Sequence, residues 1–106
     1  MIVMNLYYSG EGTAAQDFVR EMEASGIADR IRKEDGNLRY SYFMSTEDDS
    51  TVLLIDAWRD QEALDVHHQS DMMAEIAQLR DKYDLHMKAE RYVPVTGEED
   101  ASFLRK

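Results

Sequence analysis

The residues of this chain best suited to chemistry near neutral pH are its three histidines, two of which are adjacent. His67 and His68 stand together, and His86 stands apart. An imidazole has an unperturbed pKa of about 6.5 and can therefore take and return a proton at neutral pH. His67 follows Ala63 and Leu64 by one helical turn, so it should lean toward the apolar side of its helix. His68 is rotated by about 100° from His67, which places it at the surface.

Two interpretations of His67 remain open from the residues alone. In the first, its ring is a proton-transferring group beside a small-molecule pocket. In the second, it is a buried histidine that only holds its helix to a strand. Adjacent histidines are poor metal ligands on a helix, where positions i and i+4 are needed, so we expect no bound metal.

Aromatic residues on two predicted strands offer a wall for such a pocket. Trp58, the only tryptophan, closes one strand, while Tyr40 and Tyr42 share one face of another with Leu38. An indole can stack on an aromatic ligand, and tyrosine hydroxyls can bind a quinol or carbonyl oxygen. Ordinary core packing explains the same residues. Asp56 shares the face of Trp58, where a carboxyl group is costly unless it is paired or at the rim.

The chain also carries several methionines that are able to line an adaptable pocket or simply fill a core. These are Met22, Met44, Met72, Met73 and Met87. Of the two interpretations, core packing is the more common for such residues.

The order of the predicted elements is strand, helix, strand, strand, helix, strand. Alternating apolar residues predict strands over 2–8, 38–45, 51–58 and 85–93. Apolar stripes predict one helix over 13–25 with a shorter piece after Gly26, and another over 60–69 that continues to 83. This order is typical of the ferredoxin-like split βαβ fold, an α+β fold whose four-stranded antiparallel sheet carries two helices on one face. The uncovered face should pack against a second copy, forming a homodimer.

Polar residues mark the expected helix starts. Thr13 and Gln16 have the spacing of a capping box, and Asp60 is a good N-cap. Ser70 or Asp71 can begin the continuation of the second helix. These positions fix where the helices should begin.

Length and charge limit the organisation and the partners. The 106 residues fit one domain over 1–95 with a polar tail over 96–106, which we expect to be flexible or to dock on a partner subunit. With 22 acidic and 12 basic residues the formal charge is −10, which disfavours nucleic acid and anionic membranes. No segment has the apolar length to span a bilayer. Without cysteine there is no disulfide or thiolate chemistry, and the lack of a signal-peptide pattern predicts a cytoplasmic protein.

The segments KEDGNLRYSYF (33–43) and LLIDAWRDQEALDVHHQS (53–70) resemble the antibiotic biosynthesis monooxygenase superfamily, small dimeric α+β barrel proteins. The matching positions are Gly36, Tyr40, Trp58, Ala63, Leu64 and His67. The resemblance implies a monooxygenase without cofactors that acts on a small quinol-like or aromatic substrate. In that interpretation His67 is the base, and the substrate contacts are Asn5, Tyr40, Tyr42, Trp58 and Met72.

The chain departs from the family pattern in one important place. Many members have a second histidine five residues after the first, followed by an aromatic residue, where this chain has Met72 and Met73. Only the role of His67 therefore transfers. Haem-degrading members carry their haem-ligating histidine where this chain has Ala77, so we do not expect haem binding.

Two other functions remain possible from the sequence. One is an isomerase of a small phosphorylated diketone, in which His67 would move a proton between adjacent carbons and arginines would bind the phosphate. The arginines available for that role are Arg39, Arg59, Arg80 and Arg91. The other is a dimeric module that binds a ligand without turning it over.

Overall fold

The frame of the molecule is one antiparallel sheet. The computed structural model describes residues 1–95 and 97–105, and its strands lie in the order β2-β3-β1-β4. The strands are β1 (Ile2–Ser9), β2 (Asn37–Met44), β3 (Thr51–Trp58) and β4 (His86–Tyr92). Every neighbouring pair is antiparallel. This strand order, with β1 and β3 at the centre, confirms the predicted ferredoxin-like α+β fold.

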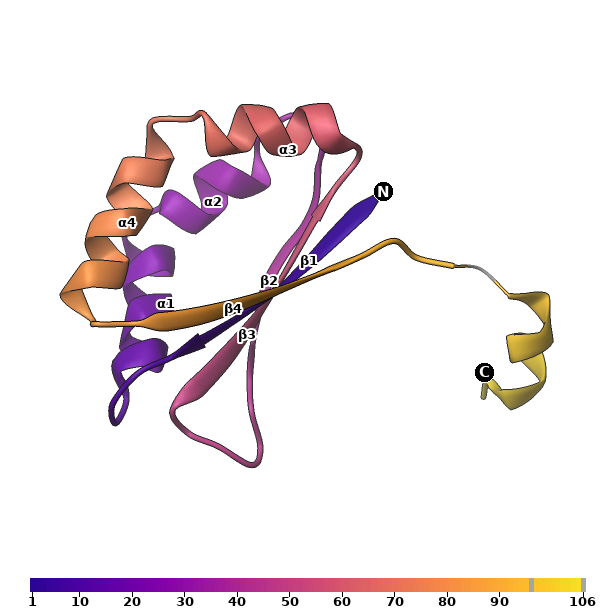
Figure 1. Cartoon of the computed structure of the whole chain (residues 1–106), viewed down its shortest axis with the longest axis horizontal. Coiled ribbons are helices and arrows are strands. Elements are labelled where there is room, and N and C mark those ends of the chain that lie inside the picture. Colours follow the sequence, from indigo (N-terminus) through magenta and orange to yellow (C-terminus); the bar gives the residue numbers. More distant parts are fainter. Residues whose placement is uncertain (96, 106) are drawn as a thin grey trace.

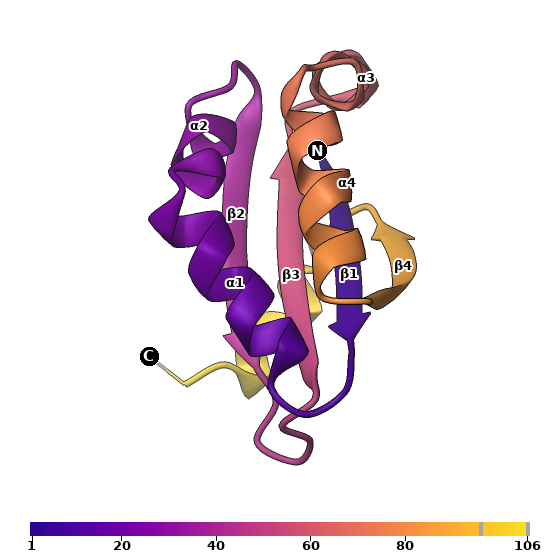
Figure 2. The same cartoon turned by 90° about the vertical axis from the view of Figure 1, so that its left-hand side faces the viewer.

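Helices cover one face of this sheet (Figure 1). They are α1 (Ala14–Ala24), α2 (Ile27–Arg32), α3 (Gln61–His68) and α4 (Met72–Lys82). Figure 2 looks through the helices onto the sheet and shows α1 and α2 in front of β2 and β3, with α4 in front of β1. The C-terminal segment lies behind the sheet in the same view. Within the described residues the two sheet faces therefore differ, one being covered by helices and the other open.

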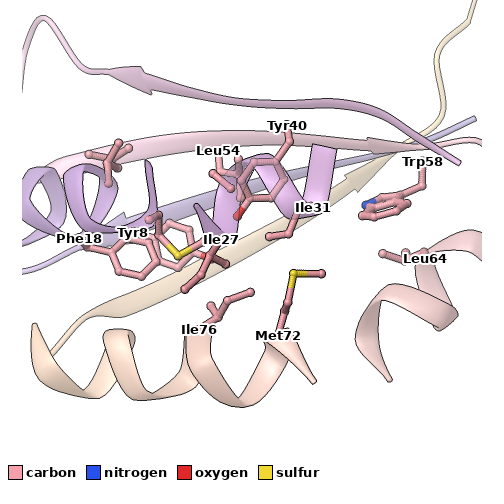
Figure 3. Packing of buried hydrophobic residues seen from close by; sticks show 14 of the residues in the cluster. Tyr8, Phe18, Ile27, Ile31, Tyr40, Leu54, Trp58, Leu64, Met72 and Ile76 are labelled. Carbon is pink, nitrogen blue, oxygen red and sulfur yellow. The ribbon is translucent and has the colours of Figure 1, made fainter. Parts of the chain in front are cut away.

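The core fills the space between the sheet and the helices. Successive strand residues point to opposite faces, so the even-numbered residues of β1 and β3 face the helices. The largest fully buried side chains come from both layers and are Trp58, Phe18, Met22, Ile31, Leu54, Leu64 and Val52. Figure 3 shows several of them interdigitating.

The helix starts agree only partly with the sequence prediction. The predicted capping box is wrong, because Thr13 Oγ1 donates instead to Asp17 Oδ2 (3.0 Å) and Gln16 Nε2 donates to a backbone carbonyl oxygen of the β2–β3 loop (2.9 Å). The predicted cap of α3 is confirmed, since Asp60 Oδ1 accepts a hydrogen bond from the backbone N–H of Ala63 (2.9 Å). Asp71 precedes α4 but makes no side-chain cap.

Leu38 is the exception on the buried face of β2. The pairing of β2 with β3 shifts between Asn37 and Arg39, and this irregularity turns Leu38 outward, where 56% of it is exposed. Tyr40 keeps the predicted inward direction and is 5% exposed. The prediction that Leu38 shares the face of Tyr40 is therefore wrong, because strand alternation does not persist through a bulge.

The segment after β4 leaves the domain on the side away from the helices (Figure 1). It contains a short 3₁₀ helix, η1 (Glu98–Phe103), and exposed apolar side chains at Val95, Phe103 and Leu104. Thr96 and Lys106, which belong to the predicted tail, lie outside the described residues. None of the helices in the described ranges has the length and apolar character needed to cross a membrane.

Candidate active site

A pocket of about 240 Å³ opens on the helix-covered side of the sheet, against α4. Most of its lining is apolar and consists of Met4, Leu6, Leu54, Met73, Ile76, Met87 and Ala89. The polar residues of the lining are Tyr8, Tyr40, Asp56, His67, His68 and Arg80. A few polar groups converging on a compact apolar space are typical of a small-molecule site.

His67 lies on the buried side of α3. The buried residues of this helix are Ala63, Leu64 and His67, which confirms the predicted inward orientation, and only 5% of His67 is exposed. Its ring stacks on the indole of Trp58, with centroids 4.7 Å apart and planes inclined by 29°. The stacking and the burial together fix the orientation of the imidazole.

The carboxylate of Glu34 contacts a ring nitrogen of His67. Its Oε2 lies 2.6 Å from Nδ1 of His67. Glu34 precedes Gly36, whose φ is +85°, and a Cβ at that glycine would lie 2.5 Å from Cβ of Ala63. The turn therefore approaches α3 closely enough for Glu34 to reach the ring. With Nδ1–H donating to this carboxylate, Nε2 is the nitrogen that is free to accept a proton.

The environment of His67 favours its neutral form. Burial lowers the pKa of His67 below its usual 6.5, and the nearby Glu34 carboxylate opposes part of that effect, while His68 adds to it. His68 is exposed, as predicted, but its ring centroid lies 5.6 Å from that of His67 and it also lines the pocket. At neutral pH His67 is consequently able to act as a base.

Two tyrosines supply hydrogen-bond donors beside this base. The hydroxyl oxygens of Tyr40 and Tyr42 are 2.9 Å apart. Burial raises the pKa of both, so both hydroxyls stay protonated. Figure 3 shows the Tyr40 hydroxyl pointing from the sheet toward the helices. Tyr40 lines the pocket, whereas Tyr42 does not and is linked to it through the Tyr40 hydroxyl.

Four of the expected site residues do not line the pocket, namely Asn5, Tyr42, Trp58 and Met72. Met72 is part of the core, with 7% exposed, and the neighbouring Met73 lines the pocket instead. Asn5 lies between Met4 and Leu6, which both line the pocket, so strand alternation turns Asn5 to the open face of the sheet. Within the described structure its Oδ1 is buried without a hydrogen-bond partner.

Asp56 is a pocket residue that was not expected to be part of the site. It is 4% exposed, and its Oδ1 has no hydrogen-bond partner among the described residues. Burial raises the pKa of Asp56 to about 7, with the Trp58 N–H opposing this rise and Glu34 contributing to it. Besides His67, the pocket thus contains a carboxyl group that titrates near neutral pH. In the sequence, the position of Asp56 two residues before Trp58 indicates that both side chains point to the same face of β3.

Arg80 and Tyr8 were also not expected at the site. Arg80 Nη1 donates to the Sδ of Met87 (3.1 Å), a weak acceptor, and its buried Nε has no partner in the described part of the chain. Burial raises the pKa of Tyr8 to about 12, and the positive charge of Arg80 opposes that rise.

No group of three or more histidine or carboxylate side chains in the described ranges is placed to hold a metal ion.

These features define a ferredoxin-like α+β domain whose helix-covered side encloses a pocket with a buried, carboxylate-paired histidine. Residues 1–79 match the family described as "Antibiotic biosynthesis monooxygenase". Because the match spans most of the chain, this protein belongs to that family.

Known proteins resemble the chain both in sequence and in fold. "Putative monooxygenase YcnE" of Bacillus subtilis (strain 168) is 26% identical over 70 residues, which are 66% of this chain and 72% of YcnE. A "putative antibiotic biosynthesis monooxygenase" from Deinococcus radiodurans has a similar structure, with a TM-score of 0.77, 18% identity, and coverage of 92% of this chain and 95% of its own. The N63A mutant of SnoaB, described as a cofactor-independent oxygenase from Streptomyces nogalater, has a TM-score of 0.76 at 12% identity and the same coverage.

Proposed function

We propose that this protein is a monooxygenase of a small quinol-like aromatic substrate, with His67 as the base and no metal or flavin. The observation that carries the proposal is the Glu34–His67 pair at a compact, largely apolar pocket. Family membership supports an oxygenase, as do the names of YcnE and of the structurally similar SnoaB.

The proposed chemistry begins with proton removal. Nε2 of His67 accepts the proton of a phenolic hydroxyl, and the imidazolium that forms is stabilised by the Glu34 carboxylate. The phenolate is electron-rich enough to transfer an electron to dioxygen directly. Conversion of a hydroquinone to a hydroxyquinone places one oxygen atom on the ring and releases the other as water. That conversion supplies all four electrons that dioxygen requires, so no external reductant is needed.

Oxygen consumption with a panel of quinols tests this proposal. We expect turnover by the wild type and a loss of about 10²- to 10⁴-fold in kcat for His67→Ala, the usual contribution of a general base. Gln69→Ala, at an exposed position just after α3, is the matched control and should keep its activity. The proposal fails if the wild type consumes no oxygen above buffer with any quinol, or if His67→Ala matches the wild type.

One observation keeps an isomerase as a second candidate. Arg80 lines the pocket and forms no ion pair with a carboxylate in the described residues, so it is free to bind an anionic group such as a phosphate. In that reaction His67 would move a proton between adjacent carbons. Turnover of a phosphorylated diketone in anaerobic buffer would distinguish isomerisation from oxygenation, and tight binding without turnover would indicate a ligand-binding module.

We further propose that a second copy of the chain covers the open face of the sheet. Leu53 and Ile55 lie on that face and are only half-buried within the protomer, and Phe43 and Tyr92 are more exposed still. The segment after β4, with Phe103 and Leu104 exposed, lies on the same side and is placed to contact the second copy. An apolar sheet face of this kind is stabilised by being covered.

A further inference from the structure

Asp56 is the least explained side chain of the pocket. It is a β3 residue on the face that packs against the helices, between the buried residues Leu54 and Trp58. Its strand partners are Met4 and Tyr40. A carboxyl group removed from water is destabilising unless it is paired. Asp56 takes part in no ion pair in the described chain, and its Oδ1 accepts no hydrogen bond there, so stability does not explain its position.

The surroundings of Asp56 make a neutral carboxyl group available at neutral pH. Burial is the main cause of its raised pKa, and the charge of Glu34 adds to the effect. The other titratable groups that line the same pocket are Tyr8, Tyr40, His67, His68 and Arg80. A neutral carboxyl group can both donate and accept a hydrogen bond, which a carboxylate cannot.

A second buried polar atom without a hydrogen-bond partner in the described chain lies next to Asp56, outside the pocket lining. Trp58 Nε1 is buried and completes no hydrogen bond in the described residues, although the indole N–H is close enough to Asp56 to influence its pKa. The two residues are two positions apart on β3 and so point to the same face. Trp58 is fully buried in the core and does not line the pocket, so the polar group that the pocket offers beside His67 is the Asp56 carboxyl group, whose Oδ1 has no hydrogen-bond partner among the described residues.

We propose that Asp56 determines substrate specificity by hydrogen-bonding a second oxygen substituent of the ring, so that dihydroxy aromatics bind in preference to monophenols of the same size. The first oxygen would face Nε2 of His67. This inference rests on the proposed function for the placement of the ring beside His67. It adds to the proposed function the residue that selects for the second oxygen of the ring.

The test compares two ring compounds of nearly equal size by anaerobic calorimetry, so that no oxygen chemistry takes place. Hydroquinone carries a second hydroxyl where p-cresol carries a methyl group. A buried polar group left without a partner costs about 1–3 kcal/mol, so the wild type should prefer hydroquinone by about 5- to 150-fold. Asp56→Asn, which keeps a donor and an acceptor, should retain a preference. Asp56→Leu should lose it or bind p-cresol more tightly.

The effect of the Asp56 substitutions on folding stability is measured separately, and we expect them to stabilise the protein. A pKa raised from 3.8 to about 7 means that the contribution of Asp56 to stability is full below 3.8 and is lost as pH rises through about 7. Asp56→Asn and Asp56→Leu should therefore unfold at a higher temperature than the wild type above pH 7, and the difference should shrink in acid. Asp71→Asn, an exposed aspartate outside the pocket, is the matched control and should change neither binding nor the melting temperature.

The possible outcomes distinguish a failure of this inference from a failure of the proposed function. Equal binding of the two compounds by the wild type, no binding of either, or an unchanged preference in Asp56→Leu would overturn the role of Asp56. Oxygen consumption together with any of these results would leave the oxygenase proposal standing. A preference that depends on Asp56, without turnover of any quinol, would support the role of Asp56 and remove the oxygenase.

Discussion

The contact between Glu34 and His67 determines which ring nitrogen can act as the base. The 2.6 Å approach of Oε2 to Nδ1 favours the tautomer with its hydrogen on Nδ1. The same carboxylate partly offsets the effect of burial on the pKa of His67. Glu34 thus acts as a positioning residue, since its contribution passes through the imidazole.

Glu34→Gln tests this positioning role by its effect on titration. The variant keeps an oxygen acceptor but loses the charge that raises the pKa of His67, so that pKa should fall further below 6.5. Proton–nitrogen NMR of the histidine side chains measures both the pKa and the tautomer. Glu62→Gln, at an exposed position on α3, should leave both unchanged. A wild-type spectrum with the hydrogen on Nε2 would contradict the assignment.

The individual residues of the site are also the part of the structure that the sequence predicts least well. The inward direction of His67 follows from its spacing to Leu64, and the placement of Asn5 on the open face follows from its parity against Leu6. The family resemblance places Asn5 in the site against that parity, and the structure follows the parity. Glu34 could not have been found this way, because 33 residues separate it from His67 and no local pattern reports such a contact.

At the scale of elements, the turn before β2 and helix α3 form one structural unit. Gly36 has a left-handed backbone, and the space that its Cβ would need is taken by Ala63 of α3. The backbone N–H of Arg59 also donates to the carbonyl oxygen of Gly36 (2.8 Å). These contacts hold Glu34 and His67, which belong to different elements, at a fixed separation.

Gly36→Ala should lower the free energy of unfolding by more than Gly26→Ala. The two glycines have nearly the same φ, +85° and +84°, but nothing lies within 4 Å of a Cβ at Gly26. Both variants should lose about 1 kcal/mol from backbone strain, and only Gly36→Ala adds the clash with Ala63. Denaturant unfolding gives both values. Equal losses would show that the turn can move away from α3.

The elements themselves were largely predictable, because their periodicity is local. All four strands and the break between α1 and α2 at Gly26 follow from the alternation and from one glycine. The capping box failed because Thr13 and Gln16 found other partners, Asp17 and the β2–β3 loop, which sequence spacing does not include. Arg80 stands one helical turn after Ile76, and this spacing is the sequence feature that indicates its approach to the pocket.

At the scale of the whole molecule, the two faces of the sheet differ in what they present. The helix-covered face holds the pocket, and the open face presents Leu53 and Ile55. The formal charge of −10 per chain opposes self-association, so dimerisation through this face should strengthen with added salt.

Ile55→Lys should weaken a dimer that forms through the open face. The substitution places a charge among apolar residues that a second copy would cover, whereas Ala77→Lys adds the same charge at an exposed position of α4. Sedimentation velocity over a range of protein concentrations measures the effect. A monomeric wild type, or equal behaviour of the two variants, would count against this interface.

The stacking of Trp58 on His67 gives the protein a built-in optical probe. Because Trp58 is the only tryptophan, all indole emission comes from the ring that stacks on His67. A protonated imidazole quenches a neighbouring indole more strongly than a neutral one does. Fluorescence intensity followed against pH in the wild type and in Asp56→Asn would therefore report the charge of His67 and separate it from that of Asp56, without labels.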